Sequence, residues 1–239
     1  LSLVIPTKNR KYWIERMLKY YIEVKFSGNI VLADSSDQYS LDMLLKKFTN
    51  KNNEFVPNIK IIHCPKLRAE EAISKALKYV KTKYVLVIND DDIILSTNLG
   101  DGIKFLERNE DYVGFIGRSF SIKTKNDQPF CKDVILKNYN LHSSSKNCPM
   151  NRCVDYISKP SNCVMVVMTT SLAKKAFSFS NSLDPYHQHF IFGEIIHGLI
   201  VCGAGKIKMF NFSYCVRQNH SQNEYNNLNF YKFITVSKW

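Results

Sequence analysis

Short apolar runs alternate with helical patterns through the first hundred residues, at intervals of about 25 to 30 residues. This rhythm is typical of repeated β-α-β units, in which crossover helices join parallel strands. We expect strands at residues 1–5, 30–33, 59–63 and 84–88. The sequence therefore predicts an α/β fold with a mainly parallel central sheet flanked by helices.

Helices are expected in the intervals between these strands. Apolar side chains recur at helical spacing over residues 11–23 and 72–80, and a shorter helix is expected at 41–48. Pro6 should stop the first strand, because proline has no N–H to donate to a ladder.

The rhythm changes after residue 95, and fewer elements can be assigned. We expect strands at 112–116 and 163–168 and helices at 171–177 and 192–201. The polar stretch 119–161 reads as a long loop, which in a compact domain is more often functional than a linker. With only nine glycines and seven prolines, the chain gives no sign of a domain boundary, and we expect one domain over residues 1–239.

The net charge is +12, which raises nucleic acid, a membrane surface or a phosphorylated small molecule as partners. The basic residues are dispersed, with runs no longer than pairs, which disfavours a specific nucleic-acid surface. The longest apolar run, 163–168, is far shorter than the 18 to 20 or so residues of a spanning helix. Seven cysteines, an odd number, favour a reducing compartment. We therefore expect a cytoplasmic protein, with peripheral contact at an anionic inner membrane face as an option.

Three consecutive aspartates, Asp90, Asp91 and Asp92, follow the strand expected at 84–88. Open α/β sheets place their ligands at the carboxyl ends of such strands, and neighbouring carboxylates repel one another. A hard cation would relieve the repulsion, because Mg²⁺ or Mn²⁺ binds one or two carboxylates together with substrate phosphates. An acidic surface turn that caps a helix is the alternative.

Three segments resemble family 2 glycosyltransferases with the GT-A fold. Residues 4–10 read Val-Ile-Pro-Thr-Lys-Asn-Arg, like the family's V-I-P-T-x-N-R opening, and residues 30–37 look like its V-V-D-D-G-S-x-D segment. Residues 84–92 are similar to the strand and Asp-x-Asp-type metal motif that follow. The resemblance covers about the first hundred residues. It implies an inverting, metal-dependent transfer of a sugar from a nucleoside diphosphate to a hydroxyl.

The resemblance also implies a nucleotide-sugar site. Pro6, Thr7 and Arg10 would line the nucleotide pocket. Asp34 would accept a hydrogen bond from the imide of a uracil-type base, and Arg68 would contact the base from the start of the third helix. For each of these except Pro6, a structural role as a helix cap or a solvated charge is the alternative.

The same resemblance implies a Mn²⁺ or Mg²⁺ ion on the donor diphosphate. Asp91 would be its principal ligand, with Asp92 behind it and Asp90 nearer the ribose. Asn89 stands where many members have the first aspartate, so the register is open by one residue. Arg217 or His220 would reach the metal or the diphosphate from a C-terminal loop, with an ordinary polar loop as the alternative.

A catalytic base is suggested by residues 193–195, which resemble the family's G-E-D segment before an apolar helix. Glu194 is the candidate base and Asp184 the reserve, because the acceptor hydroxyl must lose its proton as it attacks. Ile195 replaces the usual aspartate. Together with Asn89, this departure keeps open a protein that binds nucleotide sugar without turnover.

On this resemblance, residues 1–95 form the nucleotide-binding half and 96–239 the acceptor-binding half of one GT-A-like domain. The expected partners are a nucleotide-diphospho-sugar donor, of the UDP type, and a glycan or lipid-linked acceptor, as in polysaccharide biosynthesis. A sugar-phosphate nucleotidyltransferase is disfavoured, because residues 6–11 contain no glycine for a phosphate loop. A basic protein that binds nucleic acid or a membrane surface is the alternative from another class.

Overall fold

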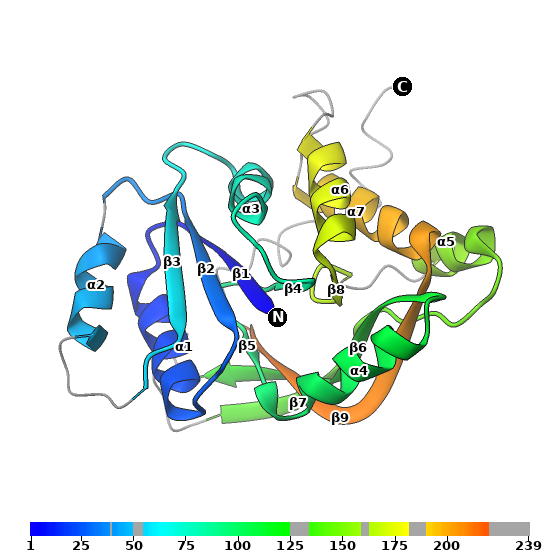
Figure 1. Ribbon diagram of the computed structural model, residues 1–239, viewed down its shortest axis with the longest axis horizontal. Coiled ribbons are helices and arrows are strands. Elements are labelled where there is room, and N and C mark those ends of the chain that lie inside the picture. Colours follow the sequence, from blue (N-terminus) through cyan, green and yellow to red (C-terminus); the bar gives the residue numbers. More distant parts are fainter. Residues whose placement is uncertain (39, 50–54, 125–133, 159–162, 182–189, 220–239) are drawn as a thin grey trace.

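The computed structural model describes residues 1–38, 40–49, 55–124, 134–158, 163–181 and 190–219 (Figure 1). The strands in this part of the chain are β1 (Ser2–Thr7), β2 (Asn29–Asp34), β3 (Asn58–His63), β4 (Tyr84–Val87), β5 (Ile93–Ile94), β6 (Tyr112–Thr124), β7 (Val134–Tyr139), β8 (Val167–Thr169) and β9 (Lys206–Asn219). The helices are α1 (Lys11–Glu23), α2 (Ser40–Thr49), α3 (Ala69–Leu77), the 3₁₀ turn η1 (Ser96–Asn98), α4 (Leu99–Arg108), α5 (Pro149–Ser158), α6 (Thr170–Asn181) and α7 (Phe190–Ala204).

The strands form one sheet in the order β3-β2-β1-β4-β8-β6-β9-β5, with β7 paired to β6. The first four strands along the chain pair in parallel, as the β-α-β rhythm predicts. The second half of the sheet is mixed: β8 runs antiparallel to β4 and β6, whereas β6 and β9 are parallel. The predicted α/β class is confirmed, and the parallel arrangement belongs mainly to the first hundred residues.

Helices cover both faces of the sheet. In Figure 1, α1 and α2 lie on one side of β1–β3, and α3 lies on the other side with α6. The predicted inner face of α1 is confirmed, because Ile14, Met17, Leu18 and Tyr21 are fully buried. Helix α7 packs against both α5 and α6, which explains why its sequence is apolar almost all round. In the part of the chain that the structure describes, no helix combines the length and the apolar character needed to cross a membrane.

The expectation that Pro6 ends the first strand is wrong. Strand β1 runs on to Thr7, and Pro6 pairs in register with Ala33 of β2. Backbone groups alternate in direction along a strand, and the carbonyl of Val4 accepts a hydrogen bond from the N–H of Ile88 on the β4 side. Pro6 faces that same side two residues later, beyond the end of β4 at Val87. Its missing N–H therefore breaks no ladder bond.

The polar stretch 119–161 is not the loop that we expected. It contains the end of β6, all of β7 and helix α5, while the strand expected at 163–168 is reduced to Val167–Thr169. Helix α4 and the long strand β9 were not expected at all. Two glycines weaken the helical signal of α4, and Gly102 is required there because a Cβ atom would lie 2.3 Å from the Phe115 ring.

A substitution at Gly198 tests how α7 packs against α5. A Cβ atom at Gly198 would lie 2.2 Å from the buried ring of Tyr156, whose hydroxyl donates to the carbonyl of Glu194 at 3.2 Å. We expect Gly198→Ala to lower the free energy of unfolding by about 1 to 3 kcal/mol through overpacking. The matched control is Gly203→Ala in the same helix, where the nearest atom is the Cys153 sulfur at 3.8 Å. Urea titration of both variants measures the difference, and equal stabilities would contradict this packing.

Candidate active site

Polar side chains from neighbouring strands meet at one edge of the sheet. Thr7 and Asp34 are register partners at the carboxyl ends of β1 and β2. Asp90 follows the carboxyl end of β4, and the Thr7 hydroxyl donates a hydrogen bond to its carboxylate at 2.7 Å. All three side chains are buried. The predicted nucleotide-binding residues of strands one, two and four therefore lie together, at the edge where open α/β sheets hold ligands.

Residues 89–92, named here the acidic turn, close on themselves. The N–H of Asp92 donates to the carbonyl of Asn89 at 3.2 Å, and the Asn89 amide donates to the Asp92 carboxylate at 3.3 Å. Asp90, Asp91 and Asp92 are 3%, 5% and 1% exposed. An acidic surface turn would leave them in water. Carboxylates buried to this degree require positive charge or hydrogen-bond donors nearby.

The start of helix α1 and the residue before it supply positive charge to the acidic turn. The Arg10 guanidinium pairs with Asp90 at 2.8 Å and with Asp91 at 2.9 Å. Six residues further along, in α1, Arg16 donates to the backbone carbonyl of Asp91. The centre of the Trp13 ring lies 5.4 Å from the Arg10 guanidinium carbon and 4.6 Å from that of Arg16. The three side chains therefore lie together at the N-terminal end of α1.

The end of β9 supplies a donor to the third aspartate. The backbone N–H of Gln218 donates to Asp92 at 2.9 Å. The Gln218 side chain accepts from Arg16 at 2.9 Å and donates to the Thr124 hydroxyl at 3.0 Å. Burial, together with the charge of Asp91, raises the pKa of Asp92 to about 8 despite these bonds. The acidic turn thus carries more negative charge than its desolvated environment favours.

The two carboxylate oxygens of Asp34 differ, because one accepts a hydrogen bond and the other accepts none from the described residues. Oδ1 accepts from the N–H of Ser36 at 3.0 Å. Oδ2 is buried and has no hydrogen-bond donor among the described residues, with Nδ1 of His63 3.9 Å away. Asp34 does not cap the next helix, which begins six residues later at Ser40. A buried acceptor of this kind is suited to an N–H group of a ligand.

Glu194 lies in the first turns of α7 and is partly buried. Burial raises the pKa of its carboxyl to about 7, the charge of Glu70 adds to the shift, and the charge of Arg217 opposes it. A carboxylate with this pKa can take a proton near neutral pH. Ile195 packs against the hydrophobic core, so the side chain that replaces the family's usual aspartate is turned into the protein.

Arg217, one residue before Gln218, interacts electrostatically with both the acidic turn and Glu194. Its guanidinium donates to the Tyr139 hydroxyl and lies 4.8 Å from the centre of that ring. Its charge acts on both Asp92 and Glu194. The end of β9 therefore lies between the acidic turn and the candidate base.

The remaining predicted residues are placed as follows. Pro6 lies half-buried in β1 beside this edge. Arg68 precedes α3 and forms an ion pair with Glu71 at 3.3 Å. Asp184 and His220 lie outside the described residues.

The sequence reasoning missed Arg16, Tyr139 and Gln218 as members of the site. Arg10, Trp13 and Arg16 recur at intervals of three residues, and this local signal could have indicated Arg16. Gln218 had no local sequence signal, because its hydrogen-bond partner Asp92 is 126 residues away in the sequence.

The carboxylates of the acidic turn suit a divalent cation that is shared with a phosphate ligand. In the described ranges, no three His, Cys, Asp or Glu side chains gather into a ligand set that would hold a metal by themselves. Two carboxylates, those of Asp90 and Asp91, are nevertheless aimed at a single cationic group, the Arg10 guanidinium. This donor set suits Mg²⁺ or Mn²⁺ shared with a phosphate ligand, because such ions need only one or two protein carboxylates.

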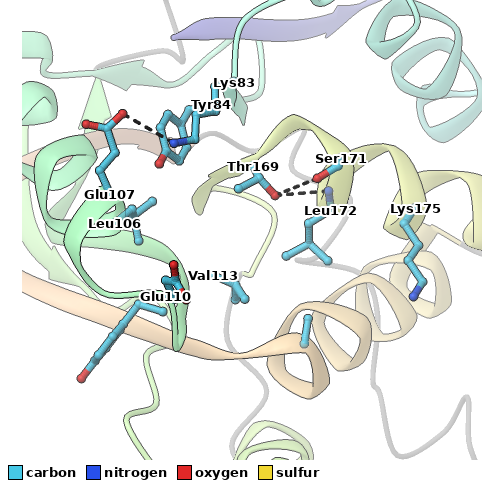
Figure 2. Close-up of a pocket in the computed structure, with 12 residues that line it drawn as sticks. Lys83, Tyr84, Leu106, Glu107, Glu110, Val113, Thr169, Ser171, Leu172 and Lys175 are labelled. Atoms are coloured by element: carbon cyan, nitrogen blue, oxygen red, sulfur yellow. Dashed lines mark hydrogen bonds and ion pairs between the residues drawn. The ribbon is translucent and has the colours of Figure 1, made fainter.

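A cavity of about 520 Å³ lies elsewhere (Figure 2). Lys83 and Tyr84, from the start of β4, line it together with Thr169, Leu172 and Lys175. The acidic turn follows the other end of β4, so this cavity is not part of the candidate site.

Comparison with known proteins gives a family and a fold. The model of Glycosyl transferase family 2 matches residues 2–171. Comparison with curated proteins gave no match. Similar solved structures include Staphylococcus aureus TarS, with 16% identity and a TM-score of 0.60, covering 91% of this chain and 36% of TarS.

Residues 1–349 of TarS in complex with UDP-GlcNAc give 15% identity and a TM-score of 0.61, covering 95% of this chain and 61% of that one. The same fragment with UDP gives 16% identity and a TM-score of 0.57, covering 91% and 60%. The chain thus spans between about a third and two thirds of these TarS chains. At such low identity the likeness concerns the fold, which is that of GT-A glycosyltransferases. On the family match over most of its length, the chain belongs to glycosyl transferase family 2.

Proposed function

We propose that this chain transfers a sugar from a nucleoside-diphosphate donor to a hydroxyl group of a glycan or lipid-linked acceptor. The transfer would invert the anomeric carbon and depend on Mn²⁺ or Mg²⁺. The observation that carries the proposal is the convergence of Thr7, Asp34, Asp90 and Asp91 from three neighbouring strands, buried at one edge of the sheet. Membership of a glycosyl transferase family supports it.

The donor base would bind at the end of β2. The open oxygen of Asp34 can accept a hydrogen bond from the N–H of a uracil ring, and the TarS complexes hold UDP and UDP-GlcNAc. We therefore favour a donor of the UDP type. Pro6 and Thr7 would flank the nucleotide from β1, and Arg68 from the start of α3.

The diphosphate would bind beside the acidic turn. Asp91 would be the principal ligand of the cation, and Asp90, already bound to Thr7, would lie nearer the ribose. Asp92, held by Gln218 and Asn89, would support them. When bound, the cation supplies positive charge that stabilises the departing diphosphate. His220 remains a proposed contact to the metal or the diphosphate.

Glu194 would act as the base. Its carboxylate takes the proton of the acceptor hydroxyl while that oxygen forms a bond to the anomeric carbon. The bond from this carbon to the diphosphate oxygen breaks, and its electron pair leaves with the diphosphate. Asp184 remains the reserve candidate for this role.

The net charge of +12 agrees with anionic partners. It would attract the donor, and also a lipid-phosphate acceptor at an anionic membrane face. A cytoplasmic location, with peripheral contact at the inner membrane face, stays part of the proposal.

Donor binding is tested by thermal unfolding with a panel of nucleotide sugars, each with and without Mn²⁺. We expect a UDP-sugar with Mn²⁺ to raise the melting temperature, since a ligand that binds only the folded state stabilises it by about 2.7 kcal/mol at a hundred times its dissociation constant. Asp91→Ala should remove the part of the shift that depends on Mn²⁺. Asp101→Ala, at an exposed position on α4, is the control and should keep it. No shift with any nucleotide diphosphate would refute the proposal.

The base is tested by the pH dependence of transfer. Below about pH 7, where Glu194 becomes protonated, the rate should fall with decreasing pH. Among the described residues, the charged or titratable groups that act on Glu194 include Glu70, Arg217, Tyr139 and Tyr156. Glu70→Gln removes a negative charge that raises the pKa of Glu194, so the acid limb should move to lower pH.

Glu194→Gln is the companion variant. It should bind donor normally and lose transfer by about 10² to 10⁴-fold, the usual contribution of a general base. An undiminished rate would assign the role to another residue. An acid limb that stays in place in Glu70→Gln would mean that it reports a different group.

A further inference from the structure

Arg10 occupies the position of a cation between two aspartates. One guanidinium nitrogen pairs with Asp90 at 2.8 Å and the other with Asp91 at 2.9 Å. These are the two carboxylates that the proposed function assigns to the donor and its metal. Arg10 therefore offsets part of the negative charge of the site, and the charges of Arg16 and Arg217 act on the same aspartates.

We propose that Arg10 is a built-in counter-ion which a divalent cation must displace from Asp91 when the site fills. The inference rests on the proposed function, and it concerns the order of events at the same site. Arg10 keeps two buried carboxylates paired until metal and donor arrive, and then exchanges places with the metal.

Charge and geometry make the two states exclusive. A guanidinium bound to Asp91 and a divalent cation bound to the same carboxylate would be two positive charges within a few ångströms, and like charges at that distance disfavour each other. Asp91 is 5% exposed, so little water is present to screen them.

The two arginines contact different parts of the acidic turn. The Arg10 side chain is 31% exposed and pairs with the carboxylates of Asp90 and Asp91 from the residue before α1. Arg16 donates to the backbone carbonyl of Asp91 and to the side chain of Gln218. A cation that takes the place of Arg10 on the Asp91 carboxylate therefore leaves both of these Arg16 contacts in place.

This exchange links the metal to the donor. A released guanidinium gains a partner when a diphosphate is present, because phosphate oxygens accept hydrogen bonds from arginine. Metal and donor should therefore bind more tightly together than separately, since each removes part of the cost of binding the other.

Mn²⁺ binding in the absence of nucleotide tests the proposal. Free Mn²⁺ is measured by electron paramagnetic resonance at pH 7.5 as protein is added. Arg10→Gln should bind Mn²⁺ about tenfold more tightly than the wild type, the lower end of the effect that one neighbouring charge has on a carboxylate. Arg10→Lys, which keeps the charge but cannot span two carboxylates, should fall between them. Arg108→Gln loses the same charge at an exposed site on α4 and should match the wild type.

Trp13 provides a second readout. The chain has two tryptophans, so Trp239→Phe leaves Trp13 as the sole indole, 5.4 Å from the Arg10 guanidinium carbon. Titration with Mg²⁺ should change its fluorescence when Arg10 is present. In Arg10→Gln the change should be lost, although the cation still binds.

Mn²⁺ affinity in Arg10→Gln that is equal to or weaker than that of the wild type would overturn the proposal, because Arg10 would then help to build the metal site. If neither protein binds Mn²⁺ while a UDP-sugar still stabilises both, the exchange fails and the proposed donor stands. If Arg10→Gln binds Mn²⁺ more tightly but no nucleotide sugar binds, the exchange stands and the proposed function fails. Melting temperatures of all variants establish that each is folded.

Discussion

Three adjacent carboxylates buried at the end of a central strand must be given positive charge or hydrogen-bond donors, and much of the architecture satisfies that requirement. Arg10, just before helix α1, and Arg16 within it reach the acidic turn, although they precede Asp91 by 81 and 75 residues. Strand β9 lies at the far end of the described chain, and the backbone N–H of its residue Gln218 donates to Asp92.

The same edge connects the acidic turn to Glu194, the proposed base. Arg217 lies beside Gln218, and its charge acts on both Asp92 and Glu194. Burial keeps the pKa of Glu194 near 7, and α7 holds its backbone against α5 through the Tyr156 hydroxyl. Residues beyond 200 complete the surroundings of the acidic turn.

The sequence predicts the first hundred residues well, because each strand and helix there carries its own period. Helix α1 was expected with the bounds observed, and Thr7, Asp34 and Asp90 were expected at the strand ends where they meet. The second half gave weaker signals. Strand β9 is 14 residues long, with few positions fully buried, and long-range pairing with β6 rather than local pattern specifies it. The role of Gln218 could not be predicted from its neighbours in the sequence, because it depends on a contact with Asp92, 126 residues away.

We propose that a cation and a donor diphosphate meet at the acidic turn at the end of β4. A crystal structure with UDP and Mn²⁺, with the metal located by its anomalous scattering, tests this most directly. We expect Mn²⁺ on the carboxylate of Asp91, the uracil N–H on Asp34, and Arg10 withdrawn from Asp91. Mn²⁺ or UDP bound elsewhere, for instance in the cavity beside Lys83 and Lys175, with Arg10 still paired to both aspartates, would contradict it.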